Sequence, residues 1–154
     1  MNFYKYLLLP FSLIYGIIIY VRNLLFDIQI LQEEEFNIPV ISVGNLTIGG
    51  TGKTPHIEYL IELLKNEYNL AILSRGYKRK TKGFILADND SKAWEIGDEP
   101  CQIKRKYPDI TVAVDANRSR GINKLMELHP SIDVILLDDA FQHRYIKPGL
   151  SIVL

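Results

Sequence analysis

The segment 38–68 reads IPVISVGNLTIGGTGKTPHIEYLIELLKNEY, and it decides the expected fold. Its first part, Ile38 to Val43, is short, apolar and β-branched, as is typical of a buried strand. The glycine-rich loop Gly49-Gly50-Thr51-Gly52-Lys53-Thr54 follows, and then apolar residues recur at helical spacing from Pro55 to Tyr68. A strand, a glycine loop and a helix in this order predict a phosphate-binding loop.

Such a loop binds phosphate through successive backbone N–H groups, which glycines leave unobstructed, and through the helix N-terminus behind it. A lysine reaches the β- and γ-phosphates, and a hydroxyl ligates magnesium. We therefore expect a site for a nucleoside triphosphate with Mg²⁺, in which Lys53 contacts the phosphates and Thr54 the metal. The predicted nucleotide-binding residues are Thr47, Ile48, Gly49, Gly50, Thr51, Gly52, Lys53 and Thr54.

One position departs from the usual pattern of this loop. The pattern begins with a glycine five residues before the last glycine, where this chain has Thr47. A glycine turn that happens to precede Lys53 and Thr54 is the alternative interpretation. The strand before the loop and the helix after it are the context that a phosphate-binding loop requires.

A second candidate site lies at Asp138 and Asp139, which directly follow the apolar stretch Val134 to Leu137. Ligands of open α/β sheets bind at the carboxyl edge of the strands. One carboxylate there would hold the magnesium shell, and the second would orient a metal-bound water or accept a proton. By itself a double aspartate after a strand is as often a turn as a site. Gln142 and His143 could reach the same region or lie on the surface.

A third candidate is Gly97-Asp98-Glu99-Pro100. Asp98 fits a helix N-cap, with an acidic residue and a proline in the first turn. Asp98 could also act as a base toward a substrate hydroxyl.

The rest of the chain alternates apolar strand-like and helix-like stretches, which predicts an α/β fold. We expect a P-loop NTPase-like core over residues 37–154, with a mostly parallel sheet covered by helices on both faces. The further expected strands and helices are Leu70–Leu73, Phe84–Ala87, Asp98–Tyr107, Ile110–Val114, Arg118–Leu128 and Leu150–Leu154. The last of these has the pattern of a central strand, and the chain stops inside it, so we expect a fragment of a longer protein.

Composition restricts the possible partners. The chain has 18 Lys and Arg and 18 Asp and Glu, so its formal charge is zero and no general field attracts nucleic acid. Cys101 is the one cysteine, and no Cys/His spacing typical of a metal site is present. A reducing, cytosolic setting is indicated for the soluble part, and no obligate protein partner is inferred.

The N-terminal residues 1–36 are predicted to form a membrane-associating helical segment. From Tyr6 to Val21 no residue is charged, but this run is short for a span of about 20 residues. Beyond Arg22 the pattern becomes amphipathic, so we expect a helix that dips into the membrane or lies along it. The alternative is a buried core helix of a soluble protein.

Four motifs together closely resemble the tetraacyldisaccharide 4'-kinase family of lipid A biosynthesis. They are Ser42–Pro55, Ser74-Arg75-Gly76-Tyr77, Gly97-Asp98-Glu99-Pro100 and Asp138-Asp139-Ala140-Phe141-Gln142-His143, in the family's order. Thr47 in place of the first loop glycine is normal for that family.

The resemblance implies transfer of the ATP γ-phosphate to the 4'-hydroxyl of a lipid A disaccharide precursor, with Mg²⁺. It implies an enzyme on the cytoplasmic face of the inner membrane of a Gram-negative bacterium, peripheral or held by the N-terminal helix. Asp98, Lys53, Arg75 and Asp139 become the expected catalytic residues, and Thr54, Asp138 and Asp139 the expected metal-binding residues. Arg118 matches a family position near the reacting phosphates. The basic run Lys78-Arg79-Lys80 could meet acidic headgroups or be a solvated turn.

One feature of the family has no counterpart in this chain. Members are about twice as long, and a histidine that pairs with the catalytic aspartate lies in their second half, whereas His143 belongs to a different motif. Two other functions remain open from the residues: a membrane-tethered P-loop switch ATPase or GTPase, and a non-catalytic nucleotide-binding scaffold. Against a GTPase, the Asn123-Lys124 pair is not followed by the x-Asp of a guanine-recognition motif.

Overall fold

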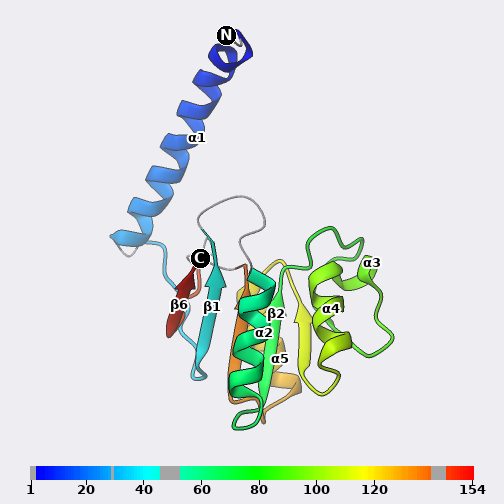
Figure 1. Cartoon of the computed structure of the whole chain (residues 1–154). Helices are drawn as coiled ribbons and strands as arrows, with labels where there is room; N and C mark the ends of the chain where they lie inside the picture. Colours follow the sequence, from blue (N-terminus) through cyan, green and yellow to red (C-terminus); the bar gives the residue numbers. More distant parts are fainter. Residues whose placement is uncertain (1–2, 29, 46–52, 140–144) are drawn as a thin grey trace. The chain divides into compact units, whose positions relative to one another are not determined.

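The computed structural model describes residues 3–28, 30–45, 53–139 and 145–154 (Figure 1). These residues belong to two compact units, Met1–Glu33 and Glu34–Leu154. The predicted nucleotide-binding residues Thr47 to Gly52, and Gln142 and His143, lie outside the described residues.

The first unit is built on the helix α1 (Phe3–Asp27). Its large apolar side chains are exposed over several turns, namely Phe11, Leu13, Ile14, Tyr15, Ile17, Ile18, Tyr20, Val21 and Leu24. Within the described part of the chain, no helix combines the length and the apolar character needed to cross a bilayer.

The second unit is a six-stranded sheet in the order β3-β4-β2-β5-β1-β6. Its strands are β1 (Val40–Gly44), β2 (Leu70–Ser74), β3 (Ile85–Leu86), β4 (Thr111–Val114), β5 (Val134–Asp138) and β6 (Leu150–Val153). Every neighbouring pair is parallel except β3 and β4. The helices are α2 (Lys53–Leu64), α3 (Ala93–Ile96), α4 (Asp98–Lys106) and α5 (Arg118–Leu128). The predicted mostly parallel α/β fold is therefore confirmed.

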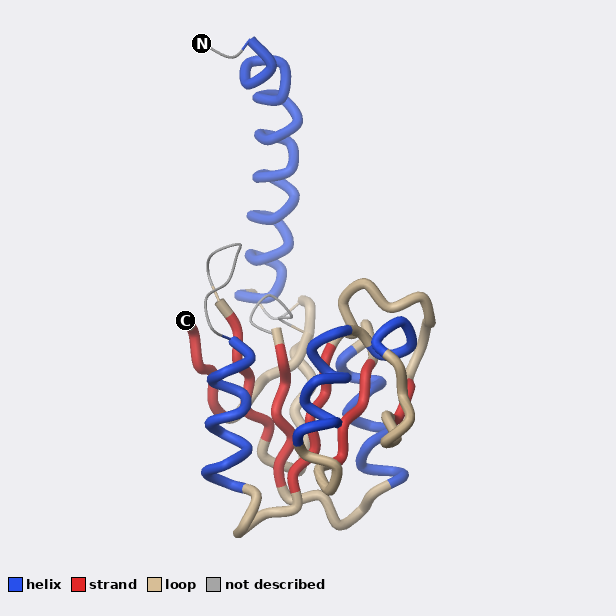
Figure 2. Tube along the Cα trace, turned by 45° about the vertical axis from the view of Figure 1, so that its right-hand side comes forward, coloured by secondary structure: helices blue, strands red, loops and turns tan. Residues whose placement is uncertain are grey.

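The helices cover both faces of the sheet because the chain reverses direction across it. From β1 the chain crosses to β2 and then to β4, and from β4 it turns back past β2 to β5 and on to β6 at the opposite edge. Right-handed crossovers in opposite directions place their helices on opposite faces. Accordingly α2 and α4 lie on one face and α5 on the other (Figure 2).

Alternate residues of each central strand enter two separate cores. In β2, Leu70 and Ile72 pack with Ile57 and Ile61 of α2, whereas Ala71 and Leu73 pack with residues of α5. The central strands β2 and β5 are buried throughout, which explains why their sequences are continuously apolar.

Two expected elements differ from the structure. The expected strand Phe84–Ala87 is the two-residue β3, which pairs antiparallel with β4. The last strand, β6, was expected to be central, but within the described residues it pairs with β1 alone. The apolar run of β6 indicated burial on both sides, whereas Leu150 and Val153 are exposed.

Candidate functional site at the carboxyl edge of the sheet

The parallel strands β1, β2, β4 and β5 end at one edge of the sheet. Ser74 is the last residue of β2, Asp115 directly follows β4, and Asp138 is the last residue of β5. Val43 lies in register with Asp138, so the segment that leads from β1 to α2 starts beside β5. The strand ends therefore bring polar groups from distant parts of the sequence to one edge.

Asp138 is held at this edge by two neighbours. Its side chain is nearly buried, with 4% of the residue exposed. The Ser74 hydroxyl donates a hydrogen bond of 3.0 Å to Oδ2 of Asp138, and Nη2 of Arg118 donates one of 2.9 Å to its main-chain oxygen. Asp139, which follows, is exposed and has a positive φ of 53°. The two carboxylates thus have different surroundings, the first fixed by hydrogen bonds and the second open to solvent.

Arg118 lies at the first position of α5 and is 2% exposed. Its Nη1 donates to the main-chain oxygen of Asp115 at 2.5 Å. Burial lowers the pKa of Arg118 to about 10, although the nearby carboxylate of Asp138 opposes this shift. The guanidinium therefore remains charged at neutral pH, and its Nε has no hydrogen-bond partner among the described residues. A buried positive charge is fixed between the ends of β4 and β5.

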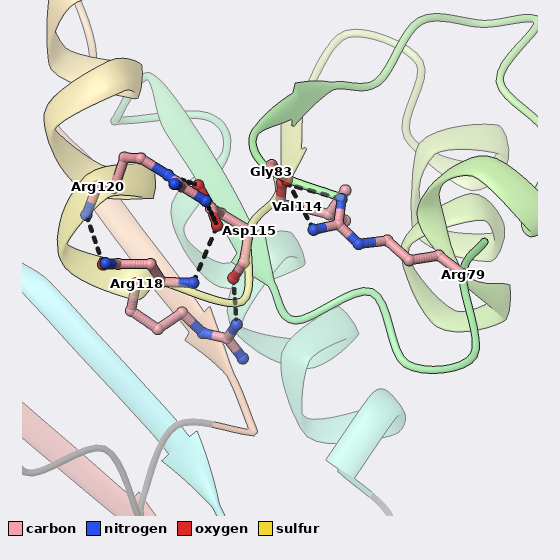
Figure 3. Close-up of polar contacts among 7 residues, drawn as sticks. Arg79, Gly83, Val114, Asp115, Arg118 and Arg120 are labelled. Carbon is pink, nitrogen blue, oxygen red and sulfur yellow. Dashed lines mark hydrogen bonds and ion pairs between the residues drawn. The ribbon is translucent and has the colours of Figure 1, made fainter. Parts of the chain in front are cut away.

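Asp115 organises the loop that leads into α5 (Figure 3). Arg120 binds its carboxylate through two hydrogen bonds, each of 2.8 Å, and the Asn117 N–H donates to the same group at 2.9 Å. Burial alone would raise the pKa of Asp115, but the hydrogen bonds of Arg120 and Asn117 outweigh it and lower the pKa. Asp115 is therefore ionised at neutral pH and stabilises the turn that places Arg118.

The segments that follow β2 and precede α4 pack backbone against backbone. A Cβ on Gly97 would lie 3.0 Å from the Tyr77 oxygen and 3.1 Å from Gly76, and a Cβ on Gly76 would lie 2.8 Å from the Ile96 oxygen. Only glycine permits this approach, and both glycines have a positive φ. The contact brings the exposed Asp98 close to the end of β2, where Arg75 is also exposed.

Comparison with known proteins identifies the family. The family described as tetraacyldisaccharide-1-P 4'-kinase matches residues 4–154 of this chain. The chain belongs to this family.

Curated relatives in the family are similar over nearly the whole chain. A tetraacyldisaccharide 4'-kinase of Parabacteroides distasonis is 61% identical over 150 residues, which are 96% of this chain and 41% of the relative. A protein of the same name from Flavobacterium johnsoniae is 56% identical over all 154 residues, which are 45% of its length. The chain thus spans less than half of these curated relatives.

A solved structure in the family has the same fold. It is a crystal structure of LpxK from Aquifex aeolicus, described as an "apo" form in complex with ATP, and it is 42% identical with a TM-score of 0.85. The match covers 95% of this chain and 47% of that one.

Several predicted site residues share the carboxyl edge in this family fold. Arg75, Asp138 and Asp139 directly follow or end parallel strands, and the Gly97 contact adds Asp98. Lys53 and Thr54 form the start of α2. The prediction of Asp98 as N-cap is wrong: Gly97 is the N-cap of α4, and Asp98 is the first helical residue with Glu99 beside it in the first turn. The glycine takes the capping position because the close approach to Tyr77 leaves no room for a side chain.

The sequence interpretation missed three residues of this edge: Ser74, Asp115 and Arg120. Asp115 follows β4 as Asp138 ends β5, so the rule that selected Asp138 also applies to it. Arg120, the partner of Asp115, could not be recognised from the sequence in the same way, because an arginine at such a position is common on a helix surface. Ser74 was quoted as part of a motif without a role, which its hydrogen bond to Asp138 now gives it.

The Asp115 carboxylate is expected to contribute measurably to stability. Asp115→Asn should lower the free energy of unfolding by about 1–3 kcal/mol near pH 7, because a buried hydrogen-bonded charge is lost and donors are left poorly paired. The folded-state pKa is depressed, so this contribution is present above about pH 4 and disappears as the pH falls through the lower folded value. Denaturant unfolding of both proteins between pH 7 and pH 3 measures it. A difference that stays constant over this range would contradict the assignment.

The glycine contact is expected to be required for stability. Gly97→Ala should lower the free energy of unfolding by about 2–3 kcal/mol, because its φ of 97° is strained for alanine and the methyl group meets Tyr77. Gly83→Ala is the matched control, since Gly83 has a φ of 78° but nothing within 4 Å of a Cβ. Equal losses in urea titrations of the two variants would show that the contact carries no energy.

Proposed function

We propose that this chain is the nucleotide-binding and catalytic part of a tetraacyldisaccharide 4'-kinase, which transfers the γ-phosphate of ATP to the 4'-hydroxyl of a lipid A disaccharide precursor. The proposal is carried by one observation above all. The Gly76–Gly97 approach places the Asp98 segment at the strand edge that also holds Arg75 and Asp138. In this proposal the acceptor base and the groups that bind phosphate and metal all come from this one edge of the sheet.

Phosphoryl transfer needs charge neutralisation and in-line placement more than covalent help. In the proposed mechanism Lys53 and Arg75 offset the charge that develops on the γ-phosphate. The loop residues from Thr47 to Thr54 hold the nucleotide phosphates. Asp98 accepts the proton of the sugar hydroxyl as a general base. Such catalysis typically raises the reaction rate by about 10²–10⁴-fold. The buried cation of Arg118 keeps the end of β5 in place through the main chain of Asp138.

The residues at the end of β5 fit a magnesium ion. Mg²⁺ prefers oxygen ligands and usually takes one or two carboxylates together with substrate phosphates and water. Asp138 and Asp139 supply two carboxylates, and Thr54 supplies a hydroxyl at the start of α2. Among the described residues no group of three or more His, Cys, Asp or Glu side chains is arranged to hold a metal ion. Bound Mg²⁺ would neutralise phosphate charge and orient the γ-phosphate.

We also propose that the protein works at the cytoplasmic face of the inner membrane, on a lipid acceptor that stays in the bilayer. The exposed apolar side chains of α1, from Phe11 to Leu24, support an interfacial helix. Extraction of the complete protein from membranes at high pH tests α1 as a peripheral anchor, and release of the protein into the soluble fraction is expected. No nucleic-acid partner and no obligate protein partner is part of this proposal.

Incubation of the complete protein with radiolabelled ATP and the disaccharide lipid precursor, followed by separation of the lipids, tests this function. Label in the lipid fraction is expected. A membrane-tethered switch ATPase or GTPase would release inorganic phosphate without labelling the lipid. A nucleotide-binding scaffold would leave the nucleotide intact.

A further inference from the structure

The segment that follows β2 is unusually basic and lies at the carboxyl edge of the sheet, beside the candidate site. Residues 75–82 read RGYKRKTK, which contains five basic residues and no acidic one. We call residues 76–83 the lysine loop. It starts at the carboxyl edge of the sheet and passes beside the short helix α3 (Figure 1).

The lysine loop is held in one shape by its own inward-turned arginine. The Arg79 guanidinium donates to the main-chain oxygen of Gly83 at 2.6 Å and to that of Val114, the last residue of β4, at 3.5 Å (Figure 3). The Arg79 N–H also donates to the Gly76 oxygen at 3.3 Å. Arg79 therefore anchors the loop to the sheet.

A second set of bonds ties the loop to α3. The Lys80 N–H donates to the Trp94 oxygen at 2.7 Å, and the Thr81 hydroxyl donates to the Glu95 oxygen. Together with the Gly76–Gly97 contact, these bonds fix both ends and the middle of the loop. The alternative interpretation of this basic run, a solvated turn, does not require such anchoring.

The anchored loop presents its remaining charges to solvent beside two aromatic rings. Lys78, Lys80 and Lys82 are exposed. Tyr77 is 69% exposed and Trp94 is 54% exposed. The result is a patch of lysines and large amphipathic rings at the end of the sheet where Asp98 also lies.

Two acidic side chains of neighbouring segments, one in α3 and one after β3, accept local hydrogen bonds. Glu95 accepts the Lys92 N–H at 2.8 Å, and Asp88 accepts the Ser91 hydroxyl at 2.8 Å and the Asp90 N–H at 3.0 Å. Among the residues that the structure describes, Lys78, Lys80 and Lys82 form no salt bridge, so their exposed charges are available to an external anion.

We propose that the lysine loop, with Tyr77 and Trp94, is a contact surface for an anionic lipid bilayer. Lysines near a bilayer of anionic lipids each add about fivefold to binding, and Tyr and Trp favour the headgroup region. The zero net charge of the chain disfavours a nucleic acid as the occupant. The inference deepens the proposed function and rests on it in one respect: an acceptor that remains in the bilayer must meet Asp98 at that surface.

Vesicle sedimentation of the complete protein tests this surface. The variant Lys78→Gln/Lys80→Gln/Lys82→Gln is compared with a helix variant, Lys65→Gln/Lys106→Gln/Lys124→Gln. The helix variant removes the same charge from the residue after α2 and from helices α4 and α5. Vesicles of phosphatidylethanolamine with phosphatidylglycerol provide the anionic surface, and phosphatidylcholine vesicles the neutral one. Thermal unfolding of both variants checks that they are folded.

The loop variant is expected to lose at least tenfold in affinity for anionic vesicles relative to the helix variant. The two variants should bind neutral vesicles with the same affinity, because α1 is unchanged in both. Their difference in affinity for anionic vesicles should vanish at about 1 M salt. Equal binding of both variants to anionic vesicles would overturn the inference. It would also be overturned if the loop variant lost affinity for RNA but kept its affinity for anionic vesicles.

A kinase assay in nonionic detergent micelles separates this inference from the proposed function. The loop variant should there phosphorylate the acceptor as the wild type does, since no anionic surface is present. If the wild type itself transfers no phosphate, the proposed function fails, while the vesicle result still decides the surface.

Discussion

Replacement of Asp98 by asparagine in the complete enzyme is expected to lower turnover by about 10²–10⁴-fold. The asparagine keeps the size of the side chain but cannot accept a proton from the sugar hydroxyl. The affinity for ATP should change little, because Asp98 belongs to α4 and its role is assigned to the acceptor rather than to the nucleotide. Initial rates at saturating ATP, with ATP binding measured by calorimetry, give both quantities.

The control for this prediction is Asp109→Asn. Asp109 is also exposed and follows the other end of α4, away from the carboxyl edge, so its variant should retain wild-type turnover. Near-normal turnover of Asp98→Asn would remove Asp98 from the role of base. An equal loss in ATP affinity would place Asp98 in the nucleotide site instead.

The second large effect is expected for Asp138→Asn. Loss of this carboxylate should lower turnover at least about 10²-fold and raise the Mg²⁺ concentration needed for half-maximal rate, because metal-ion stabilisation of charge is worth several kcal/mol and each 1.36 kcal/mol is tenfold in rate. The asparagine still offers an oxygen to the Ser74 hydroxyl, so the fold should persist. Magnesium titrations of the initial rate measure the effect.

The same strand offers a matched control at its opposite end. Asp133 precedes β5 and accepts hydrogen bonds from the N–H and the side-chain amide of Asn69, at 2.8 and 3.0 Å. Asp133→Asn should cost some stability but leave the Mg²⁺ requirement unchanged. A wild-type magnesium profile for Asp138→Asn, or a shifted one for Asp133→Asn, would refute the metal assignment.

Much of the fold was readable in the sequence because its central strands are buried on both faces. Leu70–Ser74 and Val134–Asp138 are continuously apolar until their last residue, and the expected helix Arg118–Leu128 agrees with α5. The edge strands were harder, since the pairing of β3 and the outer position of β6 depend on neighbours rather than on local pattern.

The site was only partly predictable for a related reason. Asp138 was found because it follows an apolar strand, which is a local signal, whereas Arg75 was assigned through the family resemblance. The proximity of Asp98 to the end of β2 depends on two glycine backbones in contact, and the Asp115–Arg120 pair depends on a turn into a helix. Such tertiary contacts leave little trace in residue spacing. The roles of these residues in catalysis remain predictions.

The most direct test of the central claim is the position of the transferred phosphate. The complete protein is incubated with radiolabelled ATP and either the disaccharide lipid precursor or the same lipid with its 4'-hydroxyl blocked, and the labelled lipids are analysed by mass spectrometry and NMR. The account predicts label at the 4' position of the unblocked lipid, and none in the blocked one. Equal labelling of both lipids, or release of inorganic phosphate without lipid labelling, would contradict it.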